Sequence, residues 1–401
     1  GGYGVKLVNP GGVELYKRGA GNVTSLDDEG PGVTPRQVLE TIAGAVDDLG
    51  LPHPVHVHCN NLGVPGNHRT TLDTLRTLDG RRAHLAHLQF HAYGGRPGGR
   101  PRSRAPELAE YLNAHPEVSA DVGQVMFGPA TTMTADAPVS AALAEITHGR
   151  WVNADTEVET GCGIVPFTYR ERNYVHALQW GIGLELFLLS RDPWRLVLST
   201  DHPNGGSFLS YPRLIRLLMD REFRNEQIRR VNRKAIQRTV LGDDLDREYT
   251  LEEIAIITRA GPARLLGLRD KGHLGVGADA DITIYDDRAD REEMFAAPRY
   301  VLKNGHAVVE DGELREAGPG RLLRVGAEYD PSIEPTLEGL FEGRYSVPFA
   351  DYPVREPWLL EPARTIPAQS PPAQPKGSDP LGMRHDPRGR TNREPKGSDP
   401  S

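Results

Sequence analysis

The feature that most constrains this chain is a series of short apolar runs that each end in a polar residue. The run at residues 196–198 leads into Ser199, Thr200, Asp201 and His202 and then into a Pro-Asn-Gly-Gly loop. A buried strand that delivers an acid at its carboxyl end is how parallel α/β barrels present a catalytic or metal-binding group. The alternative is a plain strand exit in which Asp201 caps a neighbouring helix.

Composition excludes several classes of protein. The 401 residues carry a formal net charge of −8, with 38% hydrophobic and 25% charged residues. This acidic balance argues against a nucleic-acid partner, because neutralising phosphates requires an excess of Lys and Arg. No window reaches the roughly 18 apolar residues of a membrane span, so we expect a soluble protein. Cys59 and Cys162 are too few for a disulfide framework, which favours a reducing, cytoplasmic location.

Predicted strands and helices alternate through the first 200 residues. A strand at residues 4–8 contains Lys6, and Thr34, Pro35 and Gln37 then supply the N-cap, first-turn proline and capping-box residue of a helix. Further strands are predicted at residues 54–58, 83–90, 118–125 and 196–198, and further helices at residues 70–78, 106–113 and 172–189. Alternating elements of this size predict parallel βα units, and polar strand ends favour a barrel over an open sheet.

Four predicted strand ends carry side chains that can bind a metal ion. They are a lysine (Lys6), a histidine from His56 or His58, another from His87 or His91, and the acid Asp201. The two-residue period of a strand puts His56 and His58 on one face, and puts His87 and His91 on one face with His84 on the opposite face. Such ends converge on one mouth of a barrel. Imidazole and carboxylate are natural zinc ligands, and a lysine can join them only when carbamylation removes its charge.

The pattern changes after the barrel region. Residues 251–268 predict a helical pair, and residues 272–330 predict a small β region with Gly and Asp turns. The string PKGSDP occurs at residues 375–380 and again at 395–400, so residues 367–401 are predicted to be a disordered, low-complexity tail. The predicted domains are therefore a barrel in residues 1–271, the β region in 272–330, an extension in 331–366 and this tail.

The run TLEEIAIITRAGPARLLGLRDKGHLGVGADADITIYD at residues 250–286 resembles the amidohydrolase superfamily, where it matches the closing helices and the return into a small β-sandwich. In that superfamily the metal ligands come as a His-x-His pair on the first strand, a carboxylated lysine on the fourth, one histidine each on the fifth and sixth, and an aspartate on the eighth. The resemblance implies that Lys6 is the fourth-strand lysine and His58 the fifth-strand histidine. It also implies that the sixth-strand ligand is His87 or His91 and that Asp201 is the aspartate.

Six further blocks narrow the resemblance: GVKLVNPGG, HVHCNNLGVPGN, HLQFHAYGG, DVGQVMFGPATTMTADAP, ETGCGIVPF and LSTDHPNGGSFLSYPRLIRLLMD. They look like the family formed by the A subunits of formylmethanofuran dehydrogenase and of the related formyltransferase/hydrolase complex of methylotrophic bacteria. This implies a centre of two zinc ions that makes or hydrolyses the formamide bond of formylmethanofuran, or of its bacterial analogue, with formate as the other product. It also implies a methanofuran-type carrier as substrate and the other subunits of such a complex as partners.

The sequence departs from the superfamily pattern at its start. No His-x-His pair precedes Lys6, because the chain begins at what the resemblance identifies as the fourth strand. We therefore expect an α/β fold that is an incomplete TIM-like (β/α) barrel of the amidohydrolase type with a small C-terminal β-sandwich region. The same departure implies an N-terminally truncated subunit with an incomplete metal centre, which is inactive alone.

Residue roles in the implied reaction follow from the chemistry of the side chains. Asp201 is expected to accept a proton from the attacking water and to deliver it to the leaving amine. Asn60, Asn61 and His202 are candidates for substrate hydrogen bonds, and each also fits a loop-structuring role. Two other functions stay open: another metal-dependent amidohydrolase, such as a hydantoinase or an aminoacylase, and a catalytically silent scaffold subunit.

Overall fold

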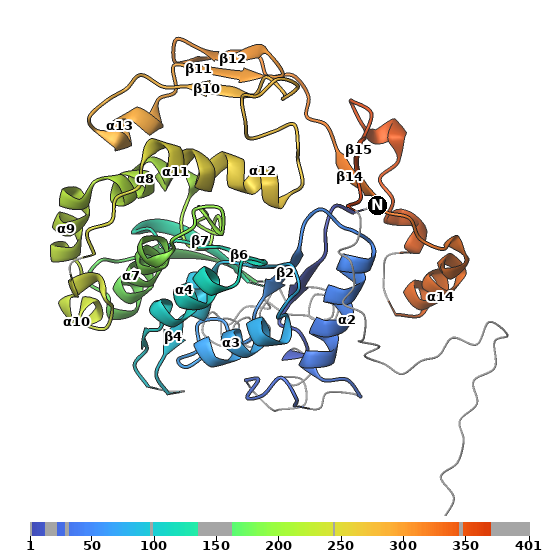
Figure 1. Ribbon diagram of the computed structural model, residues 1–401, viewed down its shortest axis with the longest axis horizontal. Coiled ribbons are helices and arrows are strands. Elements are labelled where there is room, and N and C mark those ends of the chain that lie inside the picture. The colour runs from blue at the N-terminus through green and yellow to red at the C-terminus, as the bar shows by residue number, and fades with distance from the viewer. Residues whose placement is uncertain are drawn as a thin grey trace, which may run out of the picture.

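The centre of the structure is a five-stranded parallel sheet (Figure 1). The computed structural model describes residues 2–12, 22–28, 32–96, 99–134, 163–243, 245–344 and 348–369. In spatial order and in chain order, the strands are β1 (Lys6–Val8), β2 (Val55–His58), β3 (Ala83–Leu85), β6 (Val118–Asp121) and β9 (Leu196–Val197). Every neighbouring pair is parallel, as the alternating sequence pattern predicts.

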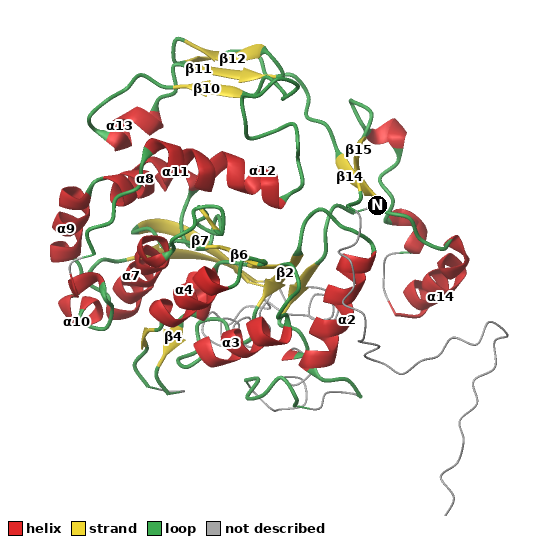
Figure 2. Cartoon of the chain, in the orientation of Figure 1, coloured by secondary structure: helices red, strands yellow, loops and turns green. Residues whose placement is uncertain are grey.

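Helices connect the strands and pack on one side of them (Figure 2). They are α2 (Pro35–Asp48), α3 (His68–Thr77), α4 (Ala105–Ala114) and α7 (Tyr174–Leu189). Val57, Leu85 and Ala120 are fully buried and belong to the same apolar cluster as Leu39 and Leu75 of the helices. Within the described residues, the sheet begins at β1 and ends at β9 without closing. The prediction of an incomplete (β/α) barrel is therefore confirmed.

Helix α2 shows how local sequence sets an element. Thr34 Oγ1 accepts a hydrogen bond from the Gln37 backbone N–H at 3.2 Å, and the Gln37 side chain accepts one from the Thr34 N–H at 2.8 Å. This is the predicted capping box, which satisfies two amide groups that a helix start leaves without partners. Leu39, Ala43 and Val46 then form the buried stripe of the helix.

Two predicted strands are shorter in the structure. The strand predicted at 83–90 ends at Leu85, because His87 takes the left-handed conformation (φ 34°) and the 3₁₀ helix η1 (Leu88–His91) follows. The strand predicted at 118–125 likewise ends at Asp121, just before Gly123 (φ 64°). The apolar residues beyond these strand ends are buried, so hydrophobic pattern alone continues the strands too far.

The second half of the chain is mainly helical. Its helices are η2 (Phe208–Ser210), α8 (Tyr211–Met219), α9 (Arg221–Arg230), α10 (Arg233–Ile236), η3 (Leu241–Asp243), α11 (Leu251–Ala255), the π-helix η4 (Ile256–Ala260) and α12 (Gly261–Leu265). The predicted helical pair at 251–268 is instead one continuous helical stretch with a π-turn in its middle. Pro262 lacks an N–H group and explains why regular α-helical bonding is interrupted there. None of the described helices is long and apolar enough to cross a membrane.

Short strands complete the fold. An antiparallel sheet of β10 (Ile282–Ile284), β11 (Tyr300–Lys303), β12 (His306–Glu310) and β13 (Glu313–Leu314) lies beyond α8 and α11, with α13 (Arg291–Ala296) between them (Figure 1). The other elements are β4 (Tyr93–Gly94), β5 (Arg102–Ser103), β7 (Gly128–Thr134), β8 (Gly163–Tyr169), β14 (Leu323–Gly326), β15 (Arg364–Pro367), α14 (Glu334–Arg344), η5 (Pro331–Ile333), η6 (Phe349–Asp351) and η7 (Glu356–Trp358). The range 272–330 of the predicted β region thus contains this four-stranded sheet and also β14, which pairs with β15 in a separate sheet.

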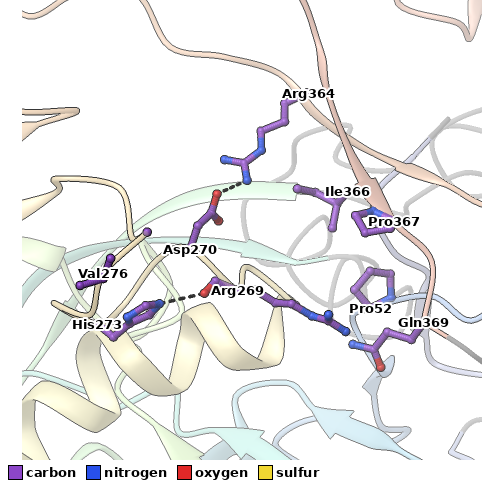
Figure 3. A pocket seen from close by; sticks show the side chains of 11 residues that line it. Pro52, Arg269, Asp270, His273, Val276, Arg364, Ile366, Pro367 and Gln369 are labelled. Atoms are coloured by element: carbon purple, nitrogen blue, oxygen red, sulfur yellow. Dashed lines mark hydrogen bonds and ion pairs between the residues drawn. The ribbon is translucent and has the colours of Figure 1, made fainter.

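The extension at residues 331–366 returns to the barrel through β15, which pairs in parallel with β14. Figure 3 shows Arg364 of β15 in direct contact with Asp270, which follows α12, and both residues line a hollow together with Pro52 and Gln369. The Gln369 backbone N–H donates to Gly50 O at 2.7 Å. The tail predicted to begin at residue 367 thus has its first three residues packed against the barrel, and residues 370–401 lie outside the described residues.

Helix α7 packs closely against the loop after β6 at Gly183. An ideal Cβ at Gly183 would lie 2.2 Å from Gln124 Oε1, and the Gln124 side chain is fully buried and donates to Trp180 O at 3.1 Å. The Gln124 side chain therefore cannot easily move away from a methyl group added at residue 183. Gly44 of α2 provides a contrast, because the nearest atom to its Cβ would be Arg81 Nη1 at 3.8 Å.

We predict opposite stability effects for alanine at these two helical glycines. Gly183→Ala should lower the free energy of unfolding, because overpacking costs about 1–3 kcal/mol while the gain in helix propensity is at most about 1 kcal/mol. Gly44→Ala is the matched control and should raise it by about 0.5–1 kcal/mol. Urea unfolding followed by circular dichroism measures both. Stabilisation by both substitutions would contradict the close packing at α7.

Candidate metal centre

Three buried histidines meet inside the open barrel at the ends of two neighbouring strands. His58 is the last residue of β2, His87 immediately precedes η1, and His91 is the last residue of η1. One ring nitrogen from each lies within 4.8 Å of the others. His87 Nε2 and His58 Nδ1 are 3.0 Å apart, and the rings of His87 and His91 are stacked with centroids 5.2 Å apart. The structure thus brings together both sixth-strand candidates and His58.

Most nitrogens of these rings have no hydrogen-bond partner among the described residues. They are His58 Nε2, His87 Nδ1 and both ring nitrogens of His91. A buried polar atom without a partner costs about 1–3 kcal/mol, so such atoms are rare unless they serve a purpose. Imidazole nitrogens gathered in this way are the ligands that zinc and related ions prefer. The residues present therefore fit a metal ion.

Burial also sets the charge state of the cluster. Burial lowers the pKa of His58 well below its usual value, and the neighbouring His87 and His91 lower it further. The pKa of His91 is lowered in the same way by burial and by His87. Both rings are therefore neutral at pH 7, and a neutral imidazole has the free lone pair that metal binding requires.

Asp201 lies in the turn that follows β9, in the left-handed conformation (φ 48°). Its carboxylate accepts a hydrogen bond from Asn204 Nδ2 at 2.9 Å, and its backbone N–H donates to Ser199 Oγ at 2.8 Å. Burial raises the pKa of Asp201, whereas the nearby His87 acts to lower it. Asp201 therefore lies close to the histidines but outside the group whose ligand atoms are within 4.8 Å.

Lys6 begins β1, at one edge of the parallel sheet, and its side chain is exposed. It is opposite His56 in the strand register. Its positive charge acts to lower the pKa values of His58 and Asp201, so it lies in the same electrostatic environment. The structure thus places Lys6 near the histidine group, without making it a member.

The predicted substrate-binding residues have structural contacts. The Asn61 side chain bonds both backbone groups of Val23, accepting from its N–H at 2.9 Å and donating to its carbonyl at 2.7 Å. Asn60 is buried and donates to Pro10 O at 3.1 Å, which holds the loop after β1. His202 is exposed, and its Nδ1 accepts from the Phe208 N–H at 3.4 Å. These contacts fit a loop-structuring role, and the substrate-binding role of the three residues stays a prediction.

Sequence reasoning missed a second group inside the barrel, formed by His56, His84 and Asp121, whose ligand atoms also lie within 4.8 Å of one another. His84 was expected to face away from His87, but the left-handed turn at His87 ends the strand and places both toward the interior. The sequence signal that could have indicated this group is Asp121, an acid at the end of an apolar strand.

Burial and the neighbouring side chains together set the charges of this second group. Burial and, to a smaller extent, the neighbouring His84 lower the pKa of His56 to about 3. Burial acts to raise the pKa of Asp121, but His84, His87 and His56 together lower it by more, so this pKa lies well below its usual value.

The sequence model of the amidohydrolase family matches residues 7–309, and the chain belongs to that family. It is 43% identical over 373 residues to the A subunit of the formyltransferase/hydrolase complex Fhc of Methylorubrum extorquens, and 43% identical over 381 residues to protein FwdA of Methanocaldococcus jannaschii. Each alignment covers 88% of this chain and 66% of the relative, so the chain spans just under two thirds of their length.

The same resemblance extends to the fold. The crystal structure of the formyltransferase/hydrolase complex (FhcABCD) from Methylorubrum extorquens with methylofuran contains a chain that is 41% identical, with a TM-score of 0.85. That match covers 92% of this chain and 68% of the other. The family resemblance expected from the sequence blocks is thereby confirmed.

The lowered histidine pKa values predict how stability depends on pH in the metal-free protein. As the pH falls below about 6.5, the unfolded chain binds protons that the buried rings of His58 and His91 do not, so the stability present above pH 6.5 is progressively lost. Each such histidine removes about 1 kcal/mol between pH 6.5 and 5.5. Urea unfolding across this range measures the slope. His91→Gln should reduce the slope, and an unchanged slope would contradict the assignment of a neutral ring.

Proposed function

We propose that this chain is part of an enzyme that makes or hydrolyses the formamide bond of a formylmethanofuran-type carrier, with formate as the other product. The observation that carries the proposal is the convergence of His58, His87 and His91 beside Asp201, in a chain that is over 40% identical to FwdA and to the Fhc relative. The named complex of the Fhc relative supports a role within an assembly, with other subunits as partners. The cytoplasmic location is part of the same proposal.

The same proposal includes the metal. His58, His87 and His91 would supply nitrogen ligands, and Lys6, if carboxylated, and Asp201 would supply oxygens. Two zinc ions are the proposed occupants, and their chemistry when bound is to polarise the formyl oxygen and to increase the acidity of water. The support from this chain is the set of buried ring nitrogens without partners at the site, among the described residues.

Asp201 is proposed to carry the proton. Burial raises its pKa above the usual carboxyl value, which brings it closer to the range where a carboxylate exchanges protons at neutral pH. Asn204 holds one carboxylate oxygen at 2.9 Å and limits rotation of the side chain. In hydrolysis, Asp201 takes a proton from the attacking water, the C–N bond breaks, and the amine leaves with that proton as formate forms. Synthesis of the formamide is the reverse, with release of water.

The test is Asp201→Asn in the assembled complex that contains this chain. An amide cannot take the proton, so formamide hydrolysis should fall by a factor of about 10² to 10⁴. The matched control is Asp287→Asn, which removes one carboxylate from a residue whose side chain is 82% exposed. Formate release measures turnover, and circular dichroism checks the fold.

Two outcomes would contradict the proposal. Turnover of Asp201→Asn equal to that of the parent would remove Asp201 from the reaction. A parent complex that hydrolyses cyclic ureides or acylated amino acids, and not the formylated carrier, would move the chain to another amidohydrolase activity.

A further inference from the structure

We infer that His56, His84 and Asp121 form a second metal site, separate from the candidate centre at His58, His87 and His91. It would take one divalent first-row transition-metal ion through two imidazole nitrogens and one carboxylate oxygen. The inference rests on the hydrogen bonds that fix both rings, and it does not depend on the proposed function.

A chain of hydrogen bonds orients the ring of His56. His53 Nδ1 lies 3.0 Å from Leu265 O, and a carbonyl oxygen can only accept, so this nitrogen carries the proton. In the neutral ring, His53 Nε2 is then an acceptor, and it lies 3.3 Å from His56 Nδ1. His56 Nδ1 therefore donates, and His56 Nε2 is left with a lone pair. That Nε2 atom is buried and has no hydrogen-bond partner within the described part of the chain.

The position of the proton on the His84 ring follows from its hydrogen bonds in the same way. Ser119 Oγ donates its single hydrogen to Ala83 O at 3.3 Å, so the hydroxyl oxygen is available as an acceptor. It accepts from His84 Nδ1 at 2.9 Å. His84 Nε2 is therefore also a lone-pair nitrogen.

Both lone pairs are directed at one carboxylate. Asp121 Oδ2 lies 3.6 Å from His84 Nε2 and 4.0 Å from His56 Nε2. A nitrogen lone pair and an anionic oxygen repel each other. The arrangement of His56, His84 and Asp121 is therefore unfavourable unless a cation lies between the three atoms. Ligand atoms around a tetrahedral zinc ion are about 3.3 Å apart, since each bond is about 2.0 Å long. The two nitrogen-to-oxygen distances exceed that value by about 0.3 and 0.7 Å, so a small contraction would bring these atoms to it.

The surrounding contacts are those of a metal site. Ligating histidines in proteins donate their second ring nitrogen to a carbonyl, a carboxylate or another acceptor, which fixes the tautomer and the ring direction. His56 and His84 both do so. Two imidazoles and one carboxylate suit Zn²⁺, Fe²⁺ or Co²⁺ and leave coordination positions open. His56 is two residues from His58 on β2, about 6.6 Å along the strand, so the two groups occupy successive levels of the barrel.

The experiment is a titration of the metal-free 401-residue chain with Co²⁺, followed by its visible absorption and by the metal content after gel filtration. Asp121→Asn should bind one Co²⁺ fewer per chain than the parent. His91→Gln acts on the first centre and should leave the Co²⁺ at His56, His84 and Asp121 in place. His115→Gln is the control for surface binding, because Asp79, His115 and Glu117 form a more exposed group of similar composition.

Ser119→Ala tests the same site if Asp121→Asn does not fold. It removes the acceptor that orients His84 and keeps all three ligands, so Co²⁺ at this site should bind about 10- to 100-fold more weakly. Parent and Asp121→Asn chains that bind equal amounts of Co²⁺ would overturn the inference and would leave a proton as the cation between the rings. An unchanged affinity in Ser119→Ala would overturn it as well. Loss of metal only in His91→Gln would support the first centre and reject the second.

Discussion

The parallel register between β2 and β3 is the interaction on which the rest of the structure depends. It sets His56 opposite His84 and Val57 opposite Leu85. Because side chains alternate along a strand, this register sends the histidines into the barrel and the aliphatic side chains toward the helices. A shift by one residue would exchange the two sets and would bury imidazoles against α2 and α3.

The interior that this register creates is polar where a core is ordinarily apolar. Burial keeps the rings of His58 and His91 neutral, and the low dielectric around them strengthens any interaction with a cation. The two histidine groups, His58 with His87 and His91, and His56 with His84, differ in how hydrogen bonds hold their rings. His56 and His84 each face a hydrogen-bonding partner, whereas neither nitrogen of His91 has one among the described residues. The fold therefore pre-orients the rings of His56 and His84, and the orientation of His91 depends more on what binds there.

Much of the fold could be predicted because the relevant signals are local. The Thr34 cap, the first-turn proline and the buried stripe of α2 all lie within a few residues of one another, and the helix begins where they place it. The histidines at the mouth were found for a similar reason, since each follows an apolar strand. His84 and Asp121 were missed because their grouping depends on the turn at His87 and on pairing across three strands. No local pattern reports either of these.

The sequence by itself determined the alternation of strands and helices, the caps, the polar residues at the strand ends and the family to which the chain belongs. Only the tertiary structure decided which polar residues meet. His87 and His91 share a site through a left-handed turn and a 3₁₀ helix rather than through the parity of a strand. His56 reaches Asp121 across β3, and Lys6 is opposite His56 at the sheet edge. Local sequence sets the conformation of neighbouring residues, whereas contacts between distant residues require the register and packing that the whole sheet imposes.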